Sequence, residues 1–315
     1  MGGAEEILMF EHIPVLLEES VSFLITNPDG IYVDATFGLG GHSKRILEKL
    51  SNKGFLVAID KDLEAIELGK RRLEAYKNIK IVHSSFSKVD EVLESLGIAK
   101  IDGILFDFGV SSLQLDKQER GFSYSKEAFL DMRMDTTSKL TAYDVVNFYS
   151  QEDLERIIRE YGEERFARRI AKAIVERRSK KPIETTTDLS SLISSLVPKP
   201  KDGSHPAQRT FQAIRIEVNR ELEEIKVALE KSLGFLKSGG RICAISFHSL
   251  EDRIVKEFFK FHSLECICPK DIPVCRCGKK KQLEIITKKP IVPSKEEIER
   301  NRRSHSAKLR VAQKV

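Results

Sequence analysis

The sequence predicts an α/β protein with a doubly wound parallel sheet into which a mostly helical domain is inserted. Apolar runs of strand length alternate with helical patterns through the first third of the chain, as in βαβ units whose sheet is covered on both faces. This alternation stops at about Leu113, and no convincing strand pattern occurs before Val218. Sheet character returns at Gly240–Phe247. We therefore expect one sheet that is interrupted after its fourth strand.

The expected strands of the first third are rich in β-branched and apolar residues, which favour extended backbone. They are Ile31–Thr36, Phe55–Ile59, Ile79–His83 and Ile104–Phe108. Between them, apolar residues recur with the 3.6-residue period of an amphipathic helix. These helical patterns are Ser43–Leu50, Leu63–Tyr76 and Val89–Leu96.

Further patterns extend to the end of the chain. The helical ones are Gln151–Glu160, Glu163–Arg178 and Glu217–Leu236, and the β-like ones are Leu264–Cys268 and Leu283–Ile291. We predict a discontinuous core of residues 1–112 and 217–315, with the helical insert at 113–216. Ligands of doubly wound sheets bind at the carboxyl ends of the strands. The insert is therefore expected to lie over the ligand site and to recognise the substrate.

Composition excludes several classes of protein. The 315 residues are 41% hydrophobic and 32% charged, with a net charge of +5, which is typical of a globular domain and too small a charge for binding nucleic acid over the whole surface. There is no apolar run of membrane-spanning length and no signal-peptide pattern at the start. We expect no membrane partner and a cytoplasmic location.

A glycine-rich turn follows the first expected strand and indicates the class of ligand. The segment is Val33-Asp-Ala-Thr-Phe-Gly-Leu-Gly-Gly-His42, and the second strand ends at Asp60. Glycine lets a ligand approach the backbone, and the helix that follows offers N–H groups at its start. A carboxylate at the end of the second strand can accept both hydroxyls of a ribose. The pattern predicts a nucleoside-containing cofactor.

The spacing of the glycines favours a methyl donor over a nicotinamide. A dinucleotide fingerprint places a third glycine where this chain has Ser43. Asp34 also stands four positions before Gly38, and acid-x-x-x-Gly-x-Gly resembles the first motif of S-adenosylmethionine-dependent methyltransferases. A nicotinamide-dependent oxidoreductase is the first alternative, and a non-enzymatic RNA-binding factor with the same fold is the second.

Asp107 at the end of the fourth strand is the candidate catalytic residue. An exocyclic amine on cytosine or adenine is a poor nucleophile because its lone pair is delocalised into the ring. A hydrogen-bond acceptor at the amine can localise that lone pair during in-line methyl transfer. Enzymes that methylate such amines commonly carry Asp/Asn-Pro-Pro-Tyr/Phe here, whereas this chain reads Asp107-Phe-Gly-Val-Ser. The departure leaves an aromatic clamp on the base undefined, and capping of the next turn is the alternative role for Asp107.

Eight ordered segments together resemble the bacterial MraW-type methyltransferase family, from about residue 12 to the C-terminus. They are His12-Ile-Pro-Val-Leu-Leu, Asp34-Ala-Thr-Phe-Gly-Leu-Gly-Gly-His42, Asp107-Phe-Gly-Val-Ser-Ser-Leu-Gln114, Arg120-Gly-Phe-Ser-Tyr124, Asp131-Met-Arg-Met-Asp135, Tyr161-Gly-Glu-Glu-Arg-Phe-Ala167, Arg209-Thr-Phe-Gln-Ala213 and Ser246-Phe-His-Ser-Leu-Glu-Asp-Arg253. The resemblance implies a Rossmann-like class I methyltransferase sheet. It also implies methylation of a cytidine N4 in small-subunit (16S) ribosomal RNA with S-adenosylmethionine as cofactor. The partner would be this RNA or the small ribosomal subunit, and a homodimer is left open.

The same resemblance implies the cofactor site. It places Gly40, Gly41 and His42 at the amino-acid end of the cofactor and Asp60 at its ribose. The remaining contacts, to the adenine and the rest of the pocket, would come from Phe86, Asp107 and Gln114. From the residues alone, Phe86 is equally compatible with core packing, and a glutamine in the turn after a strand is usually solvated.

For several other polar groups, the sequence allows both a structural and a functional interpretation. We interpret Ser249-Leu-Glu-Asp252 as a capping box before the amphipathic run Ile254–Phe261, not as part of a hydrolase site, and His248 as either a structural or a catalytic residue. Two basic sets are candidates for RNA phosphate contact or for solvated surface. They are Arg168, Arg169, Lys172, Arg177, Arg178, Lys180 and Lys181 in the insert, and Arg300, Arg302, Arg303, Lys308 and Arg310 near the end.

Methyl transfer needs no metal, and we predict no catalytic metal. Four of the five cysteines form two Cys-x-Cys pairs, Cys266 with Cys268 and Cys275 with Cys277. They are a weak candidate for structural zinc, because Cys-x-Cys crowds two ligands more than the usual Cys-x-x-Cys does. Disulfides are disfavoured in a reducing compartment. Cys243 lies within the strand Gly240–Phe247 and is expected in the core.

Overall fold

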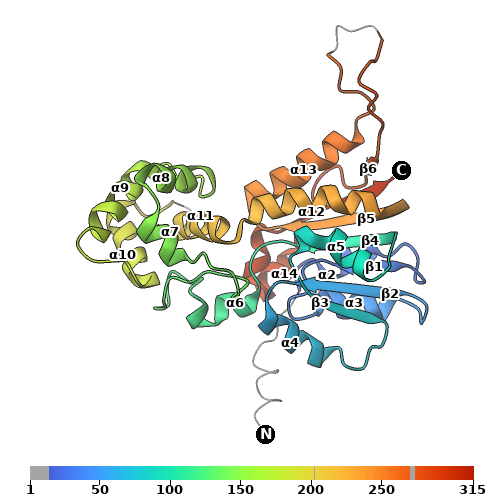
Figure 1. Ribbon diagram of the computed structural model, residues 1–315, viewed down its shortest axis with the longest axis horizontal. Helices are drawn as coiled ribbons and strands as arrows, with labels where there is room; N and C mark the ends of the chain where they lie inside the picture. The colour runs from blue at the N-terminus through green and yellow to red at the C-terminus, as the bar shows by residue number, and fades with distance from the viewer. Residues whose placement is uncertain (1–13, 202, 270–273) are drawn as a thin grey trace. The chain divides into compact units, whose positions relative to one another are not determined.

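The computed structural model describes residues 14–201, 203–269 and 274–315 (Figure 1). His12 and Ile13 of the first family-like segment lie outside these ranges. The described chain divides into two compact units. One comprises the residues up to Gly109 together with Leu222–Val315, and the other is Val110–Glu221.

The first unit is built on a sheet that has seven strands in the described part of the chain, in the order β3-β2-β1-β4-β5-β7-β6. Their bounds are β1 Ile31–Asp34, β2 Phe55–Asp60, β3 Ile79–His83, β4 Ile101–Asp107, β5 Leu236–Ser246, β6 Leu283–Ile285 and β7 Lys308–Lys314. The pairs among β1 to β5 are parallel, and β7 runs antiparallel between β5 and β6. The chain moves outward from β1 in one direction to β2 and β3, and later in the other direction to β4 and β5. The point where this order reverses, between β1 and β4, is where such sheets bind ligands. The predicted α/β class is confirmed.

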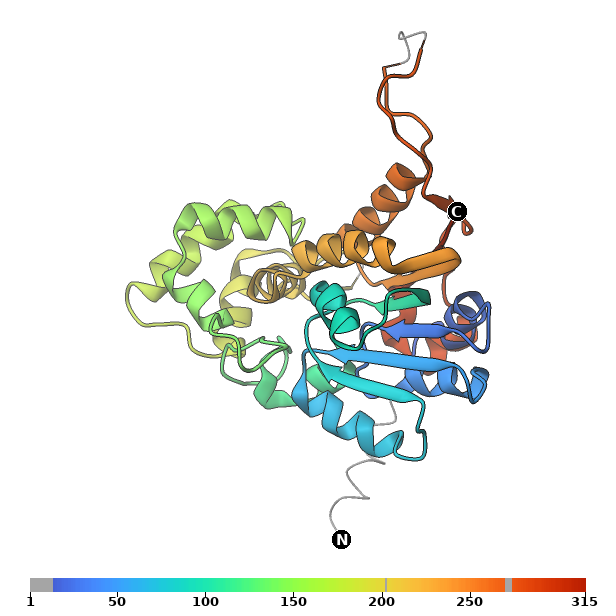
Figure 2. The same ribbon diagram turned by 45° about the vertical axis from the view of Figure 1, so that its right-hand side comes forward.

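Helices cover both faces of this sheet (Figures 1 and 2). They are α2 Leu17–Leu24, α3 Gly41–Lys49, α4 Leu63–Arg72, α5 Val89–Ser95, α12 Glu221–Phe235, α13 Ser249–Ser263 and α14 Lys295–Arg300. Successive strand residues face opposite sides, so Ile104 and Phe106 join a core with α5, α12 and α13, while Leu105 joins a core with α2, α3 and α4. Each fully buried aliphatic side chain contributes roughly 1.5–3 kcal/mol to these cores.

One predicted β pattern is wrong, and one strand of the structure was missed. Leu264–Cys268 is not a strand, because its backbone N–H groups at Ile267 and Cys268 bond to cysteine sulfur instead of to a neighbouring strand. The strand β7 was not predicted at all. Its buried residues Leu309, Val311 and Ala312 lie among basic ones, so the apolar pattern is short.

The second unit is helical. It contains α6 Ser112–Asp116, α7 Ala142–Phe148, α8 Gln151–Glu160, α9 Ala167–Arg178, α10 Thr186–Leu196 and α11 Gln208–Asn219. Side chains such as Leu154, Ile157 and Ile170 form its own core. The hydroxyl groups of Thr141, Ser150 and Thr185 cap α7, α8 and α10, as preferred N-cap residues do.

Backbone breaks shorten two predicted helices. The pattern Glu163–Arg178 becomes helical only at Ala167, because Glu163 has a left-handed backbone (φ 48°). The long pattern Glu217–Leu236 divides at Arg220, which is also left-handed (φ 50°), into the end of α11 and the start of α12. No helix among the described residues is long and apolar enough to cross a membrane.

Candidate active site

Three carboxylates end three neighbouring strands of the sheet. Asp34 is the last residue of β1, Asp60 of β2 and Asp107 of β4, and the three strands are adjacent in the order β2-β1-β4. Because the strands are parallel, the three side chains lie along one edge of the sheet. It includes the ends of β1 and β4, between which the strand order reverses.

Asp34 holds the glycine turn in shape. Its Oδ2 accepts the hydroxyl hydrogen of Ser43 at 2.6 Å, and its Oδ1 accepts the N–H of Thr36 at 3.2 Å. Burial raises the pKa of Asp34 to about 6, and these hydrogen bonds oppose the rise while the nearby Asp60 adds to it. Both oxygens of Asp34 are thus used within the protein, and its role is to position the turn.

The turn itself depends on glycine at particular positions. Gly38 and Gly40 have left-handed backbones, with φ of 52° and 78°, a conformation that costs side-chain-bearing residues energy. Gly41 is needed for space, since a Cβ there would lie 2.3 Å from Cγ of Pro14. Gly40 is the N-cap of α3 and provides no capping side chain. The first backbone N–H groups of such a helix are the ones to which an anionic ligand group can bind.

Asp60 ties the end of β2 to two turns. Its Oδ2 accepts the N–H of Gly38 at 2.6 Å, and its Oδ1 accepts the N–H of Asp62 at 2.9 Å. Burial raises the pKa of Asp60, and these two backbone donors oppose the rise. Each carboxylate oxygen has a second lone pair, so the fixed side chain can still accept a pair of ligand hydroxyls.

His42 and Asp107 lie next to each other. Nε2 of His42 is 3.1 Å from the carbonyl oxygen of Val15, which can only accept, so Nε2 donates. Nδ1 of His42 lies 3.6 Å from Oδ2 of Asp107, which is within ion-pair range but longer than a hydrogen bond. The other oxygen of Asp107, Oδ1, is buried and has no hydrogen-bond partner among the residues that the structure describes.

Asp107 also lies near two other negatively charged side chains, Asp34 and Glu251. Burial raises its pKa well above the ordinary value, and the carboxylates of Asp34 and Glu251 raise it further. The backbone N–H of Asp107 donates to Oγ1 of Thr36 at 2.7 Å, which fixes the end of β4 against the glycine turn. A buried, poorly compensated carboxyl group of this kind is typical of functional sites.

Glu251 is a site residue that the sequence analysis missed. It is fully buried, and its Oε2 accepts the N–H groups of Phe247 at 2.7 Å and His248 at 3.3 Å. Oε1 of Glu251 lies 3.1 Å from Nε2 of His248. The N-cap of α13 is therefore His248, one residue before the predicted cap Ser249. Glutamate three residues after a cap was the available signal, but nothing local indicated its proximity to Asp107.

Phe86 lies just after β3 in a group of aromatic rings. Its ring centroid is 6.1 Å from that of Phe106 and 5.8 Å from that of Phe108. Phe86 is half-buried and packs at the margin of the core. Nζ of Lys61 lies 5.8 Å from its centroid and pairs with Glu224 at 2.9 Å. This ring offers an apolar surface beside the strand ends.

Comparison with known proteins identifies the family of this chain. A family model described as the MraW methylase family matches residues 9–315. The chain belongs to the MraW methylase family. It is 92% identical over 307 residues to "Ribosomal RNA small subunit methyltransferase H" of Caldicellulosiruptor bescii, covering 98% of this chain and 100% of that protein. The protein of the same name from Clostridioides difficile is 54% identical over 309 residues, covering 97% of this chain and 99% of that protein.

This MraW-family methylase uses S-adenosylmethionine, as the glycine turn and Asp34 predict. The donor set at the strand ends fits that cofactor. Its sulfonium and ammonium groups would bring positive charge to a place where buried carboxylates repel one another, and its ribose hydroxyls would bring hydrogen-bond donors. The prediction of a methyl donor over a nicotinamide is confirmed.

Residues of the MraW-type segments in the second unit form hydrogen bonds that stabilise its local structure. Gln114 is buried in α6, where its Oε1 accepts the N–H of Ser111 at 3.0 Å and its own N–H donates to Oγ of Ser111 at 3.2 Å. The general expectation that a glutamine in such a turn is solvated is wrong here, because Gln114 completes a capping box. Its assignment to the cofactor stays a prediction.

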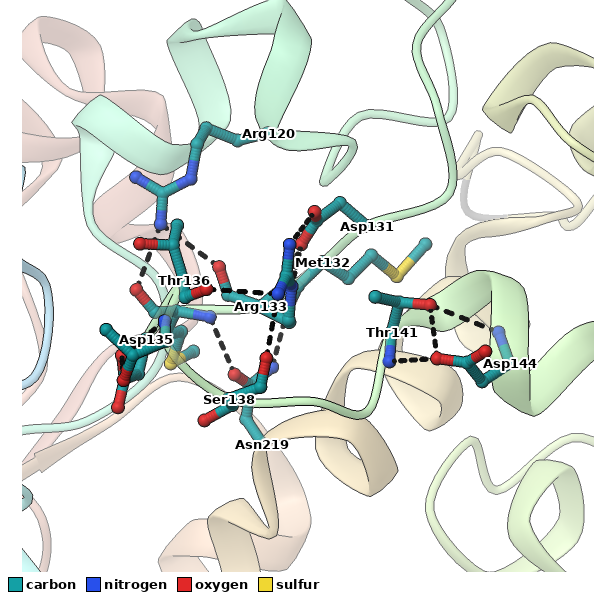
Figure 3. A network of polar contacts seen from close by, with 12 residues as sticks. Arg120, Asp131, Met132, Arg133, Asp135, Thr136, Ser138, Thr141, Asp144 and Asn219 are labelled. Carbon is teal, nitrogen blue, oxygen red and sulfur yellow. Dashed lines mark hydrogen bonds and ion pairs between the residues drawn. The ribbon is translucent and has the colours of Figure 1, made fainter.

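A network of hydrogen bonds and ion pairs fixes the Asp131–Asp135 segment of the methylase (Figure 3). Asp131 pairs with Arg133 at 2.7 Å, and Asn219 exchanges hydrogen bonds of 2.8 Å with the backbone of Met132 and Met134. Arg120 donates to the carbonyl oxygens of Arg133 and Met134, each at 3.0 Å. Arg120 and Asn219 thus hold the segment from outside it, and Met132 has a left-handed backbone (φ 58°).

The basic sets of the methylase divide into paired and exposed residues. Arg178 donates to the carbonyl oxygens of Val146 at 2.6 Å and Tyr149 at 2.5 Å, and Arg310 pairs with Asp252 at 2.6 Å, where Lys308 also lies 3.5 Å away. These residues have structural roles. The exposed members in the second unit are Arg168, Arg169, Lys172, Lys180 and Lys181. Of these, Lys172 also lies 3.6 Å from Glu176 on the surface of α9. Cys243 is buried in β5, as expected.

Proposed function

We propose that this chain transfers a methyl group from S-adenosylmethionine to the exocyclic N4 of a cytidine in 16S ribosomal RNA. The observation that carries the proposal is Oδ1 of Asp107 at the carboxyl end of β4, which is buried and has no hydrogen-bond partner in the described part of the chain. This chain is a member of the MraW methylase family. The high identity to proteins named ribosomal RNA small subunit methyltransferase H supports the substrate. The small ribosomal subunit or its RNA would be the partner, in the cytoplasm.

The proposed cofactor contacts follow from the fixed groups at the strand ends. Asp60 accepts the ribose hydroxyls, and the backbone of Gly40 and Gly41 with the side chain of His42 faces the amino-acid end. Phe86 lies against the adenine, and Asp107 and Gln114 complete the pocket. When bound, S-adenosylmethionine supplies an electrophilic methyl group on a positively charged sulfur.

Asp107 has the acceptor role in this proposal. As the N4 nitrogen forms its bond to the methyl carbon, the carbon–sulfur bond breaks and its electron pair stays on sulfur. The amine then carries one proton too many, and Oδ1 of Asp107 can accept a hydrogen bond from that amine and take the proton. The pKa of Asp107 is raised by burial and by its acidic neighbours, which makes it a stronger base than an ordinary aspartate.

The second unit, predicted as the insert 113–216, is proposed to bind the RNA through exposed basic residues of α9. Arg168, Arg169 and Lys172 lie on α9 opposite the buried Ile170 and Ile174, so they are available for phosphate contacts. The target cytidine must leave its stack to reach the cofactor. The homodimer left open by the sequence stays a prediction, which light scattering of the purified chain would test.

Two experiments test the proposal. S-adenosylhomocysteine should raise the Tm, and NAD should leave it unchanged; the reverse result would contradict the cofactor assignment. Small subunits incubated with enzyme and methyl-labelled cofactor should acquire label in 16S ribosomal RNA. Label on DNA or protein alone would contradict the proposed RNA substrate. RNA binding without any methyl transfer would favour the second alternative, a non-enzymatic RNA-binding factor.

A further inference from the structure

Four cysteines lie together away from the candidate active site, on a hairpin between α13 and β6 (Figures 1 and 2). Cys266 and Cys268 are on the outgoing side, and Cys275 and Cys277 are on the returning side. All four are free cysteines. The methyl-transfer chemistry makes no use of them.

The sulfur atoms are spaced as ligands of one metal ion would be. Sγ of Cys275 lies 3.5 Å from Sγ of Cys277, which in turn lies 3.8 Å from Sγ of Cys266. All four sulfurs lie within 4.8 Å of one another. Zinc–sulfur bonds of about 2.3 Å place tetrahedral ligands about 3.8 Å apart. The separation of Cys275 and Cys277 is close to one edge of such a tetrahedron, so a Cys-x-Cys pair can supply two ligands here without crowding.

Backbone N–H groups are directed at the sulfurs from both sides of the hairpin. Ile267, inside the first pair, donates to Sγ of Cys277, and Arg276, inside the second pair, donates to Sγ of Cys268, both at 3.4 Å. The N–H of Cys268 donates to Sγ of Cys266 at 3.3 Å. Such donors stabilise thiolates and orient metal ligands, and their exchange between the two pairs joins the two sides of the hairpin.

The described residues of this hairpin beyond its base are mostly exposed. The base is anchored, since N–H of Gln282 donates to the carbonyl oxygen of His262 at 2.8 Å and Nζ of Lys279 lies 4.3 Å from the ring centroid of Phe261. Farther out, however, Ile267 is 50% exposed and Val274 is 67% exposed. A segment without its own apolar core needs a cross-link to keep one conformation.

We propose that Cys266, Cys268, Cys275 and Cys277 bind one structural zinc ion that orders this hairpin. Four thiolates in tetrahedral array favour zinc over harder cations, and they leave no open coordination position for catalysis. Their combined charge with zinc is about −2, and the basic side chains of Arg276, Lys279, Lys280 and Lys281 lie in the same segment.

Metal analysis of the full-length chain tests this inference. Protein purified with reductant and without a metal-affinity tag should contain about one zinc per chain and bind it with a Kd of roughly 10 nM or tighter. Cys266→Ser and Cys275→Ser should lose the zinc, while the control Cys243→Ala should keep it. Cobalt substituted for zinc should give the absorption bands of a tetrahedral thiolate site.

A second readout follows the hairpin itself. A chelator should make the wild-type chain sensitive to trypsin at Arg276 and Lys279, as the serine variants already are, while the rest of the chain stays intact. Reduced protein that takes up less than about 0.1 zinc per chain from zinc-containing buffer would overturn the inference. So would iron in place of zinc, or serine variants that retain the metal. None of these results depends on methyl transfer.

Discussion

Oδ2 of Asp107 lies 3.6 Å from Nδ1 of His42, while Oδ1 of Asp107 is buried and no described residue bonds to it. The carboxyl group at the end of β4 is therefore poorly compensated in the ligand-free protein. Natural proteins keep such groups where function requires them, at a cost in stability.

Asp107→Asn should raise stability and lower activity. The substitution removes a buried charge that Asp34 and Glu251 repel, so we expect the free energy of unfolding to rise by about 1 kcal/mol. Because the acceptor for the amine proton is lost, kcat should fall by about 100-fold or more. A fall in kcat with an unchanged KM for the cofactor would place Asp107 at the target amine, and a raised KM would place it at the cofactor.

Asp102→Asn is the matched control on the same strand. At the other end of β4, Asp102 accepts the N–H of Ile31 at 2.8 Å and pairs with Lys237 at 2.7 Å. Its loss should destabilise the fold by about 1 kcal/mol and leave kcat unchanged. Equal effects of the two substitutions on stability and on kcat would contradict the functional role of Asp107.

Cofactor binding should depend on pH. The pKa of Asp34 is raised to about 6, so the folded chain binds protons more tightly than the unfolded one between the ordinary value of 3.8 and about 6. Through this group, the stability of the ligand-free chain is greatest below that window and falls as the pH rises through it. A cationic ligand favours the ionised carboxylates, so its binding should release protons.

Calorimetry in buffers of different ionisation enthalpy measures this release. S-adenosylmethionine, which carries the sulfonium charge, should release more protons near pH 6 than S-adenosylhomocysteine does, and its affinity should rise from pH 5 to pH 7. The same pH dependence for both ligands would show that the acidic strand ends do not interact with the sulfonium.

Gly41→Ala should damage both the fold and the cofactor site. The new Cβ would lie 2.3 Å from Cγ of Pro14, so the start of α3 must shift, at a cost of about 1–3 kcal/mol. We expect a higher KM for S-adenosylmethionine, measured by initial rates, and a lower Tm. The control Gly234→Ala, in α12 where a Cβ meets nothing within 4 Å, should be neutral or stabilise by up to about 1 kcal/mol. Wild-type kinetics in Gly41→Ala would refute the proposal that the cofactor lies against the backbone at this position.

Charge reversal on α9 should weaken RNA binding. Arg168→Glu combined with Arg169→Glu changes two exposed residues and should reduce affinity for 16S ribosomal RNA about 10-fold or more, with a smaller dependence on salt. Lys53→Glu combined with Lys77→Glu, two exposed residues of the first unit, is the charge-matched control. If both double variants bind RNA equally, α9 is not the RNA-binding surface.

The sequence predicted those parts of the fold whose signals are local. The strand Ile79–His83 and the helix Gln151–Glu160 have the predicted bounds, because apolar period and flanking polar residues suffice there. The strand β7 was missed because its pairing partner, β5, lies about sixty residues earlier and its few apolar residues are surrounded by basic ones. Pairing at such a distance leaves no local trace.

The sequence also predicted only part of the candidate site. Asp34, Asp60 and Asp107 were found because each follows an apolar strand, so their position at one edge of a parallel sheet could be inferred. Glu251 was interpreted only as part of a helix cap. Its effect on the pKa of Asp107 depends on packing between β4 and the segment after β5, which no local pattern describes.

The most direct test of the account is nucleoside analysis of 16S ribosomal RNA after reaction with the purified chain. Small subunits isolated from cells without this activity would be incubated with enzyme and S-adenosylmethionine, and the RNA digested and measured by mass spectrometry. We predict one new N4-methylcytidine per 16S molecule with the wild-type chain, and about 100-fold slower formation with Asp107→Asn. A methyl group on any other atom, or equal rates for the two proteins, would contradict the account.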